Sequence, residues 1–178
     1  MAGKIQWILG SVGADPTTIK TIAPTALPLL GGSIALSFLP SPSDSADEYV
    51  KQFMDINTKY NKGAVFDNNV LVGMNAGMLT VEALRAAGKN PTRASLQAAI
   101  AASGSTWASA GFSGLNYSKS SRVGYNGYWF GKIGLDGSMT PVDGAGKYTI
   151  YTTDSGAGAV VKSASKRPAM PAKGLPTN

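Results

Sequence analysis

The sequence predicts an α/β protein in which a parallel sheet with flanking helices is followed by a C-terminal β-hairpin. Residues 1–40 alternate between apolar runs and one helix signal, in the order strand, helix, strand. Capped helix patterns fill the middle of the chain, and a Gly-rich aromatic stretch with a hairpin turn follows. With 178 residues, of which 43% are hydrophobic, the chain is long enough to bury a core.

The N-terminal region has the pattern of a βαβ unit. The apolar run "IQWILG" predicts a buried strand that ends in a Gly-rich loop. Asp15 is a favoured helix N-cap and Pro16 a favoured first helical residue, and Pro24 limits the helix to about Ala23. A second strand, "SIALSFLP", then ends at Pro40. Such a unit predicts parallel pairing of the two strands.

The middle of the chain predicts three helices. Ser45 followed by Glu48 has the spacing of a capping box, and Gly63 is a plausible end of that first helix. Asp67 is expected to cap the second helix, which ends at Gly88. The predicted buried faces are Val50, Phe53, Met54 and Tyr60 in the first helix, and Val70, Met74, Gly77, Val81 and Leu84 in the second.

The stretch "EALRAAGKNPTRASLQAAI" predicts an αα-hairpin. Gly88 supplies the left-handed residue that ends one helix, and Pro91 prevents its continuation. Thr92 is expected to cap the next helix, whose buried side is Leu96, Ala99 and Ile100.

The C-terminal third predicts extended structure and then a tail. Asp136-Gly137 in "YWFGKIGLDGSMTPV" is a hairpin turn, and "KYTIYTT" is a further strand. Residues 154–178 read as a Gly/Ala linker and a disordered basic tail. The last eighteen residues, 161–178, contain no acidic residue and supply four of the six excess positive charges, in Lys162, Lys166, Arg167 and Lys173.

Composition excludes several classes of function. With no cysteine and no histidine, the chain has no thiol nucleophile, no Ser-His-Asp triad and no Cys or His metal site. We therefore expect neither an enzyme nor a cofactor or metal. The acidic cluster of Asp44, Asp47 and Glu48 fits a helix N-terminus better than a metal site. Because the excess charge lies in the tail, no nucleic-acid partner is expected.

The order of these elements resembles the C-terminal half of a type I periplasmic solute-binding protein of ABC importers, of the Leu/Ile/Val-binding kind. The resemblance covers about residues 5–143, and "ALRAAGKNPTRASLQAAI" before an aromatic hairpin is its most specific part. It implies a partial type I fold, incomplete in both lobes. The chain then divides into a second-lobe fragment at 1–39, first-lobe helices at 40–121, and a hairpin and strand at 122–153. The linker and tail at 154–178 lie beyond the resemblance.

The resemblance also implies a function. Members bind a small solute, such as an amino acid, a related amide or another small organic molecule, between two lobes. They work outside the cytoplasm, in the periplasm or as cell-surface lipoproteins, with an ABC permease. We expect no signal peptide in the opening residues, because their apolar stretch is short and contains Gln6.

Incomplete sheets require a partner. The chain is expected to be a truncated part of a longer bacterial protein, completed by its upstream half, or to pair with another copy of itself. The alternative is a structural or assembly protein that oligomerises through its open sheet edges.

The loop after the first strand is the best candidate for ligand contact. Ligands of open parallel sheets bind beyond the carboxyl ends of the strands, which here means Ser11, Val12 and Gly13. The resemblance implies an acidic residue in this loop for a ligand ammonium group, but the loop holds Val12, so a neutral or less polar ligand stays open. An ordinary strand-to-helix turn is the alternative.

Two further sets of residues are candidates. Asn69 and Leu71 lie where similar proteins place side chains near the cleft, although Leu71 also fits a core position and Asn69 a first helical turn. Three aromatic side chains also offer stacking surfaces, or equally pack across strands: Tyr125, Tyr128 and Trp129.

Overall fold

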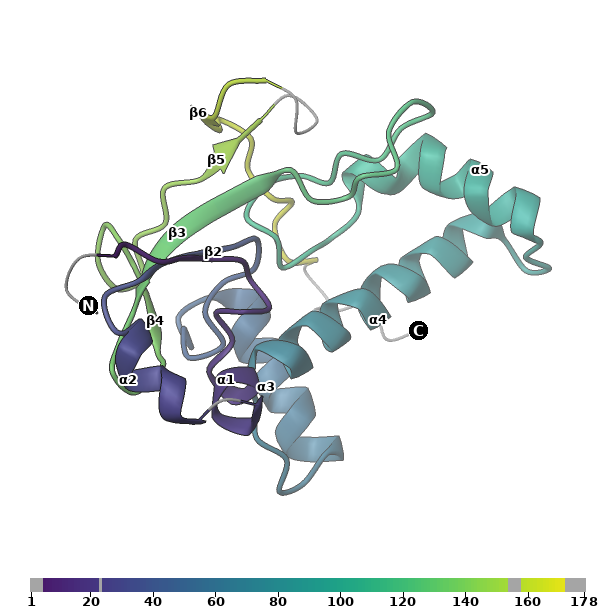
Figure 1. Ribbon diagram of the computed structural model, residues 1–178. Helices are drawn as coiled ribbons and strands as arrows, with labels where there is room; N and C mark the ends of the chain where they lie inside the picture. The colour runs from purple at the N-terminus through teal and green to yellow at the C-terminus, as the bar shows by residue number, and fades with distance from the viewer. Residues whose placement is uncertain (1–4, 23, 154–157, 172–178) are drawn as a thin grey trace.

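The computed structural model describes residues 5–22, 24–153 and 158–171, which form a body built on a sheet and a body built of helices (Figure 1). The elements are β1 (Ile8–Leu9), α1 (Pro16–Ile22), the 3-10 turn η2 (Pro24–Ala26), α2 (Leu27–Leu30), β2 (Ile34–Ser37), α3 (Glu48–Tyr60), α4 (Asn68–Ala87), α5 (Arg93–Ser103), the 3-10 turn η3 (Gly104–Thr106), β3 (Gly127–Ile133), β4 (Met139–Pro141), β5 (Tyr151–Thr152) and β6 (Val161–Lys162).

The sheet is mixed, with strand order β1-β2-β3-β5-β6 and β4 paired with β3. β1 and β2 run parallel, with Ile8 opposite Ile34, so the predicted βαβ unit is confirmed. β3 joins β2 antiparallel and continues through the predicted turn into β4. Gly137 in that turn has a φ of 81°, a conformation that glycine adopts without steric cost.

The first strand differs from its prediction. It was expected to be buried, but Ile8 is 70% exposed and β1 has a described neighbour only in β2. Apolar sequence alone does not specify burial, because burial also needs a covering element. The edge of β1 is therefore an apolar, unpaired edge in the described part of the chain.

Helix α3 is capped differently from the prediction. The Asp47 carboxylate accepts hydrogen bonds from the amides of Tyr49 and Val50, so Asp47 is the N-cap and the Ser45 capping box was wrong. An Asp at the position before the first helical residue competes directly with a Ser two residues earlier. Val50 and Phe53 are buried as predicted, whereas Tyr60 is 73% exposed at the helix end.

Helix α4 begins at the predicted cap but buries another face. The Asp67 carboxylate accepts from the amide of Val70, as expected. The buried residues, however, are Leu71, Asn75, Met78 and Ala83, one position away from the predicted set. α4 is apolar around most of its circumference, so its sequence has only a weak 3.6-residue hydrophobic periodicity. Contacts with distant parts of the chain therefore determine which face is buried.

Asn75 is the side chain that fixes this face. It is fully buried, its Oδ1 accepts from the amide of Ala110 at 2.8 Å, and its amide group donates to the Tyr125 hydroxyl. These hydrogen bonds offset the cost of burying a polar amide, so the face that carries Asn75 can be buried. Val81 and Leu84 are left 38% and 43% exposed.

The predicted αα-hairpin is confirmed. Gly88 has a φ of 91°, and Thr92 caps α5 through a reciprocal pair of hydrogen bonds with Ser95. Leu96 and Ile100 pack against a cluster around Trp107.

The main core lies where the helices meet the returning chain, and it is formed by Leu39, Tyr49, Val50, Phe53, Leu71, Met78, Ala108 and Ala110. Residues 38–126, all of which are described, contain no strand. The helices α3, α4 and α5 therefore pack without a sheet of their own.

The C-terminal segment corrects the prediction of a disordered tail. Within residues 158–171, β6 pairs with β5, and Arg167 forms an ion pair with Asp47. The guanidinium also lies 4.6 Å from the ring centroid of Tyr49 and 5.4 Å from that of Phe112. A buried ion pair between two aromatic rings offsets the entropy of ordering this segment. Residues 154–157 and 172–178 lie outside the described residues.

Helix α4 is, within the described residues, the one helix long and apolar enough to cross a membrane by length and composition alone. Its central Asn75 is buried and hydrogen-bonded to the segment that follows α5. Buried polar groups in folded proteins are hydrogen-bonded in this way, and Asn75 marks the one face of α4 that packs against the rest of the described protein.

Candidate functional site

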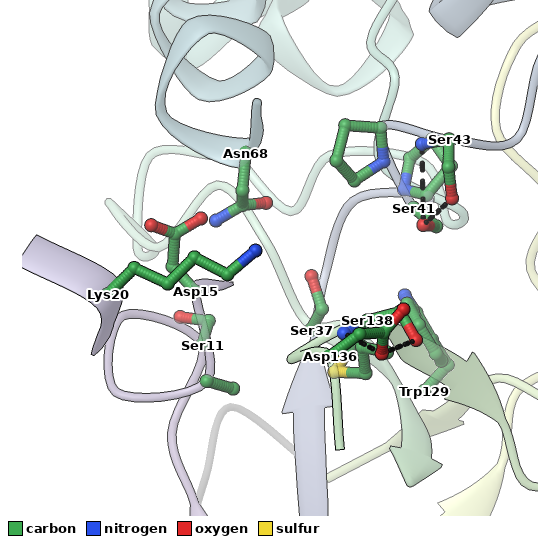
Figure 2. Close-up of a pocket in the computed structure, with 14 residues that line it drawn as sticks. Ser11, Asp15, Lys20, Ser37, Ser41, Ser43, Asn68, Trp129, Asp136 and Ser138 are labelled. Carbon is green, nitrogen blue, oxygen red and sulfur yellow. Dashed lines mark hydrogen bonds between the residues drawn. The ribbon is translucent and has the colours of Figure 1, made fainter. Parts of the chain in front are cut away.

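A pocket of about 260 Å³ lies where the sheet body meets the helical body. Its walls come from the loop after β1, the segment 40–43 that leads from β2 to α3, the start of α4 and the β3–β4 hairpin (Figure 2). The lining residues are Ser11, Ala14, Asp15, Lys20, Ser37, Pro40, Ser41, Pro42, Ser43, Asn68, Trp129, Asp136, Ser138 and Met139. Most of its polar groups are hydroxyls, which donate and accept hydrogen bonds equally well.

Asp15 is the buried charged group of this pocket. The residue is 2% exposed, and its Oδ2 accepts hydrogen bonds from the amide of Thr18 at 2.7 Å and from Nδ2 of Asn69 at 3.3 Å. Its Oδ1 is buried and has no hydrogen-bond partner. One oxygen thus caps α1 as predicted, and the other is buried without a hydrogen-bond partner among the described residues.

The opposite wall is fixed by two aromatic side chains. The indole of Trp129, 1% exposed, donates to the carbonyl of Leu39 at 2.7 Å. The Tyr148 hydroxyl donates to Asp44 at 2.8 Å and accepts from the amide of Ser41 at 3.3 Å. Burial raises the pKa of Tyr148, so the hydroxyl keeps its proton and remains a donor. The segment 39–44 is therefore held against the sheet body.

Two further charged groups stand at the mouth of the pocket. Lys20 extends across it from α1, and Asp136 lies on the far side in the β3–β4 turn (Figure 2). Hydrogen bonds from the Ser138 hydroxyl and amide, at 2.7 and 3.0 Å, lower the pKa of Asp136, and the charge of Lys20 lowers it further. Asp136 is therefore a carboxylate at neutral pH.

The predicted site residues lie in four different environments. Ser11 lines the pocket, whereas Val12 and Gly13 are exposed in the same turn and are not lining residues. Asn69 donates a hydrogen bond to Asp15 but does not itself line the pocket. Leu71 is fully buried in the main core, which is the structural role that its position also allowed.

The candidate aromatic residues also differ from one another. Tyr125 packs on Phe38 at a centroid distance of 4.5 Å, and Tyr128 donates to the carbonyl of Tyr125. Only Trp129 of the three lines the pocket, where it presents an apolar wall.

Sequence reasoning missed most polar lining residues, namely Lys20, Ser37, Ser41, Ser43, Asn68, Asp136 and Ser138. Asp15 was recognised as a helix cap, but not as a pocket residue. Its position directly after the candidate loop was the available signal, since a cap uses only one of the two carboxylate oxygens. The described residues contain no group of three or more carboxylates placed to hold a metal ion.

Comparisons with solved structures identify the fold. One neighbour is described as a branched chain amino acid ABC transporter from Thermus thermophilus with bound valine, with a TM-score of 0.62, 21% identity, and 78% of this chain and 38% of that chain covered. A substrate-binding periplasmic protein from Ralstonia solanacearum gives a TM-score of 0.64 at 23% identity, covering 77% of this chain and 38% of that chain. No family model matches this sequence. No curated protein matches it either.

These likenesses confirm the predicted fold class. The chain has part of the type I periplasmic-binding-protein fold, with a sheet flanked by helices. It spans less than two fifths of the length of the solved structures it matches. Identities of 21% and 23% identify a fold and do not transfer an activity.

Proposed function

We propose that this chain is the C-terminal half of the solute-binding component of an ABC-type importer. The observation that carries the proposal is the pocket, which is lined from both the sheet body and the helical body of a fold used by substrate-binding proteins. A concave site between two bodies, lined by apolar walls and a few polar groups, is the usual form of a small-molecule site.

The proposed ligand is a small solute such as an amino acid, a related amide or a similar organic molecule. The cavity of about 260 Å³ has room for a molecule of that size but not for a long polymer. The neighbour from Thermus thermophilus holds valine, which supports this size class. Ser11 is a proposed ligand contact. The proposed role of Val12 and Gly13 is to shape the same loop, and that of Asn69 and Leu71 is to shape the start of α4.

The proposed mechanism is binding without chemistry. Two lobes close around the solute, and an ABC permease recognises the closed form outside the cytoplasm. The chain has no cysteine or histidine to act as nucleophile or imidazole base, which supports a binding protein over an enzyme, and no cofactor or metal enters the proposal.

The proposal includes a completing partner. The apolar edge of β1 is unpaired in the described residues, and the helices of residues 48–103 have no sheet to cover. The chain also spans only 38% of each of the two neighbours. In this account the upstream half of the same protein supplies the missing strands, with a second copy of the chain as the alternative. Residues 1–39 and 122–153 then belong to one lobe and 40–121 to the other.

A structural or assembly role is the competing function. It is favoured by the exposed apolar side chains Ile8, Val81 and Leu84, which suit association with another copy. Size-exclusion chromatography with light scattering, combined with thermal-shift screening of amino acids and amides, separates the two. A solute-dependent rise in melting temperature supports the receptor. A homogeneous oligomer that responds to no solute contradicts it and supports assembly.

A further inference from the structure

The segment of residues 163–170, which we call the strap, joins the two bodies of the molecule. It leaves the sheet body after β6, where the amide of Ser163 donates to the carbonyl of Ile150 at 2.8 Å, and it ends on α3 in the helical body. In Figure 1 it runs, in yellow, from β6 toward the helices. The strap contains no helix or strand, so its contacts with the rest of the protein hold it in place.

The strap is not needed to connect the two bodies. Residues 38–47 already lead from the sheet to α3, and residues 107–126 lead back from η3 to the sheet. The strap also lies beyond residues 5–143, which carry the resemblance to solute-binding proteins. The main packing between elements stays within each body, with strands paired to strands and α4 packed on α5 and α3. A third connection therefore restrains the bodies where element packing does not.

Arg167 anchors the strap at the N-terminus of α3. Its Nη2 pairs with the Asp47 carboxylate at 2.5 Å, and its Nη1 donates to the carbonyl of Ala110 at 3.1 Å. The guanidinium also lies against the rings of Tyr49 and Phe112. Both partners of the ion pair are largely buried, so salt screens it only weakly. A planar guanidinium with directed hydrogen bonds and ring contacts fixes orientation as well as position.

Further contacts hold the strap on the same helix. The Tyr49 hydroxyl donates to the carbonyl of Pro168 at 3.1 Å, and the amide of Met170 donates to Oε1 of Glu48 at 3.1 Å. The side chain of Met170 packs against the main core. One end of the strap is thus attached beside β5 and the other on α3.

The attachment on α3 lies close in the chain to a wall of the pocket. Residues 40–43 line the pocket, and Asp44, which follows them, accepts a hydrogen bond from the Tyr148 hydroxyl. Moving α3 away from the sheet body pulls on this wall. It also stretches the strap or breaks the ion pair of Arg167 with Asp47, which leaves a buried charge without a partner. The strap therefore opposes separation of the two bodies.

We propose that the strap is a latch that holds α3 against the sheet body and limits the angle to which the two bodies open. A contact that exists in one arrangement of the bodies and is lost in another shifts the populations toward the first. The latch acts in the absence of any solute. It therefore goes beyond the proposed function and does not depend on it.

Double electron–electron resonance on the whole chain tests the latch without a solute. The chain has no cysteine, so Lys132→Cys on β3 and Asp55→Cys on α3 supply the two attachment points for spin labels, both at exposed positions. We expect a single narrow distance distribution in this labelled protein. Adding Arg167→Ala should widen the distribution at least twofold. An unchanged distribution in a folded Arg167→Ala protein overturns the proposal.

Two control variants separate the latch from a general loss of stability. Lys166→Ala removes an exposed charge from the same strap and should leave the distribution unchanged. Leu96→Ala removes packing between α5 and the cluster around Trp107, inside the helical body, and should lower the melting temperature without widening the distribution. Equal widening in Leu96→Ala and Arg167→Ala overturns the proposal, because loss of stability alone would then account for it.

Hydrogen exchange on the unsubstituted protein gives a second test that needs no folded variant. The amide of Arg167 donates to the carbonyl of Phe112 at 3.2 Å, and that of Met170 donates to Glu48. We expect both amides to exchange at least tenfold more slowly than in an unstructured peptide. Exchange of both at the unprotected rate overturns the latch. Solute binding is measured separately, so a protein with this latch that binds no solute contradicts only the proposed function.

Discussion

Two buried aspartates cap helices in this molecule, but they differ in whether the second carboxylate oxygen has a partner. Asp47 caps α3 through Oδ1, which accepts from two backbone amides, and its Oδ2 pairs with Arg167. Asp15 caps α1 through Oδ2, and its Oδ1 has no partner. The same residue type in the same local role thus forms a completed network at one place and an open acceptor at the other.

The difference shows which of the two carboxylates is fully used in stabilising the fold. Around Asp47, the C-terminal segment supplies the missing charge, and Tyr49 donates its hydroxyl to the carbonyl of Pro168. Burial raises the pKa of Tyr49 to about 12, so this donor is retained at neutral pH. Around Asp15, no cation of the described residues forms such an ion pair. The Asp47 network therefore links α3 to the C-terminal segment, whereas the second oxygen of Asp15 adds no hydrogen bond to the described structure.

Arg167→Ala is expected to have the largest effect on stability. It leaves the Asp47 carboxylate, whose side chain is 6% exposed, buried without its charge partner, and it removes the contacts with Tyr49 and Phe112. Breaking such a pair from one side costs about 3 kcal/mol. Urea unfolding of wild type and Arg167→Ala measures this loss in the free energy of unfolding. The neighbouring exposed Lys166→Ala should change the free energy of unfolding by less than about 0.5 kcal/mol, and equal small effects of both would refute the role of the C-terminal segment.

The pair Asp47→Asn and Asp15→Asn sharpens the comparison directly. Both substitutions keep a helix cap, but only the first breaks an ion pair, so we expect a loss of about 2 kcal/mol for Asp47→Asn. Asp15→Asn removes an unpaired buried charge and should change the free energy of unfolding by less than about 1 kcal/mol, or increase it. Urea titrations of the two proteins in parallel measure the difference. A large loss in Asp15→Asn would mean that its second oxygen is structural.

Glu82 offers a third buried carboxylate for the same comparison. Its Oε1 accepts from the amide of Ala108 at 3.3 Å, its Oε2 is buried without a partner, and it does not line the pocket. Burial raises the pKa of Glu82 above its usual 4.5, so its folded form holds a proton more firmly than the unfolded form. Its contribution to stability is therefore full below pH 4.5 and is lost as the pH rises through the raised pKa.

Glu82→Gln should remove that part of the pH dependence. We expect the variant to be more stable than wild type near pH 7, by about 1 kcal/mol, and to approach it at acidic pH. Unfolding free energies measured from pH 4 to 8 test this. A wild-type stability that rises through this range relative to Glu82→Gln would contradict the assigned direction.

Leu84→Lys is expected to have the smallest effect on the chain alone. Leu84 is 43% exposed on the face of α4 that the described residues leave uncovered, so the change should alter the free energy of unfolding by less than about 0.5 kcal/mol. If the upstream half covers this face, the substitution should weaken its association at least tenfold in a pull-down titration. Lys89→Ala, a change at the exposed turn after α4, is the control. Unchanged association in Leu84→Lys would place the completing surface elsewhere.

The sequence contained the local signals of the fold. Asp15 with Pro16, Asp67, Gly88 with Thr92, and Gly137 each mark an element boundary through chemistry that acts over a few residues, and the structure bears these out.

Burial was harder to predict because it depends on distant partners. The buried face of α4 follows Asn75, whose partners Ala110 and Tyr125 lie more than thirty positions later in the chain. From the sequence, Arg167 was assigned to a solvated basic tail, because its partner Asp47 lies 120 residues away in the chain.

The pocket was predictable only in outline. The position of Ser11 followed from the rule for parallel strands, but Asn68, Lys20 and Asp136 meet across three separate elements. No local sequence pattern predicts that these three side chains line one pocket.

The most direct test of the central claim is chemical-shift mapping on the isotope-labelled chain with a panel of amino acids and their amides. The account predicts saturable perturbations centred on Ser11, Asp15, Ser41 and Asn68, with none of comparable size at Asp55 or Lys166. Saturable binding that maps to another surface, or a folded chain that responds to no member of the panel, would contradict a solute site at this junction.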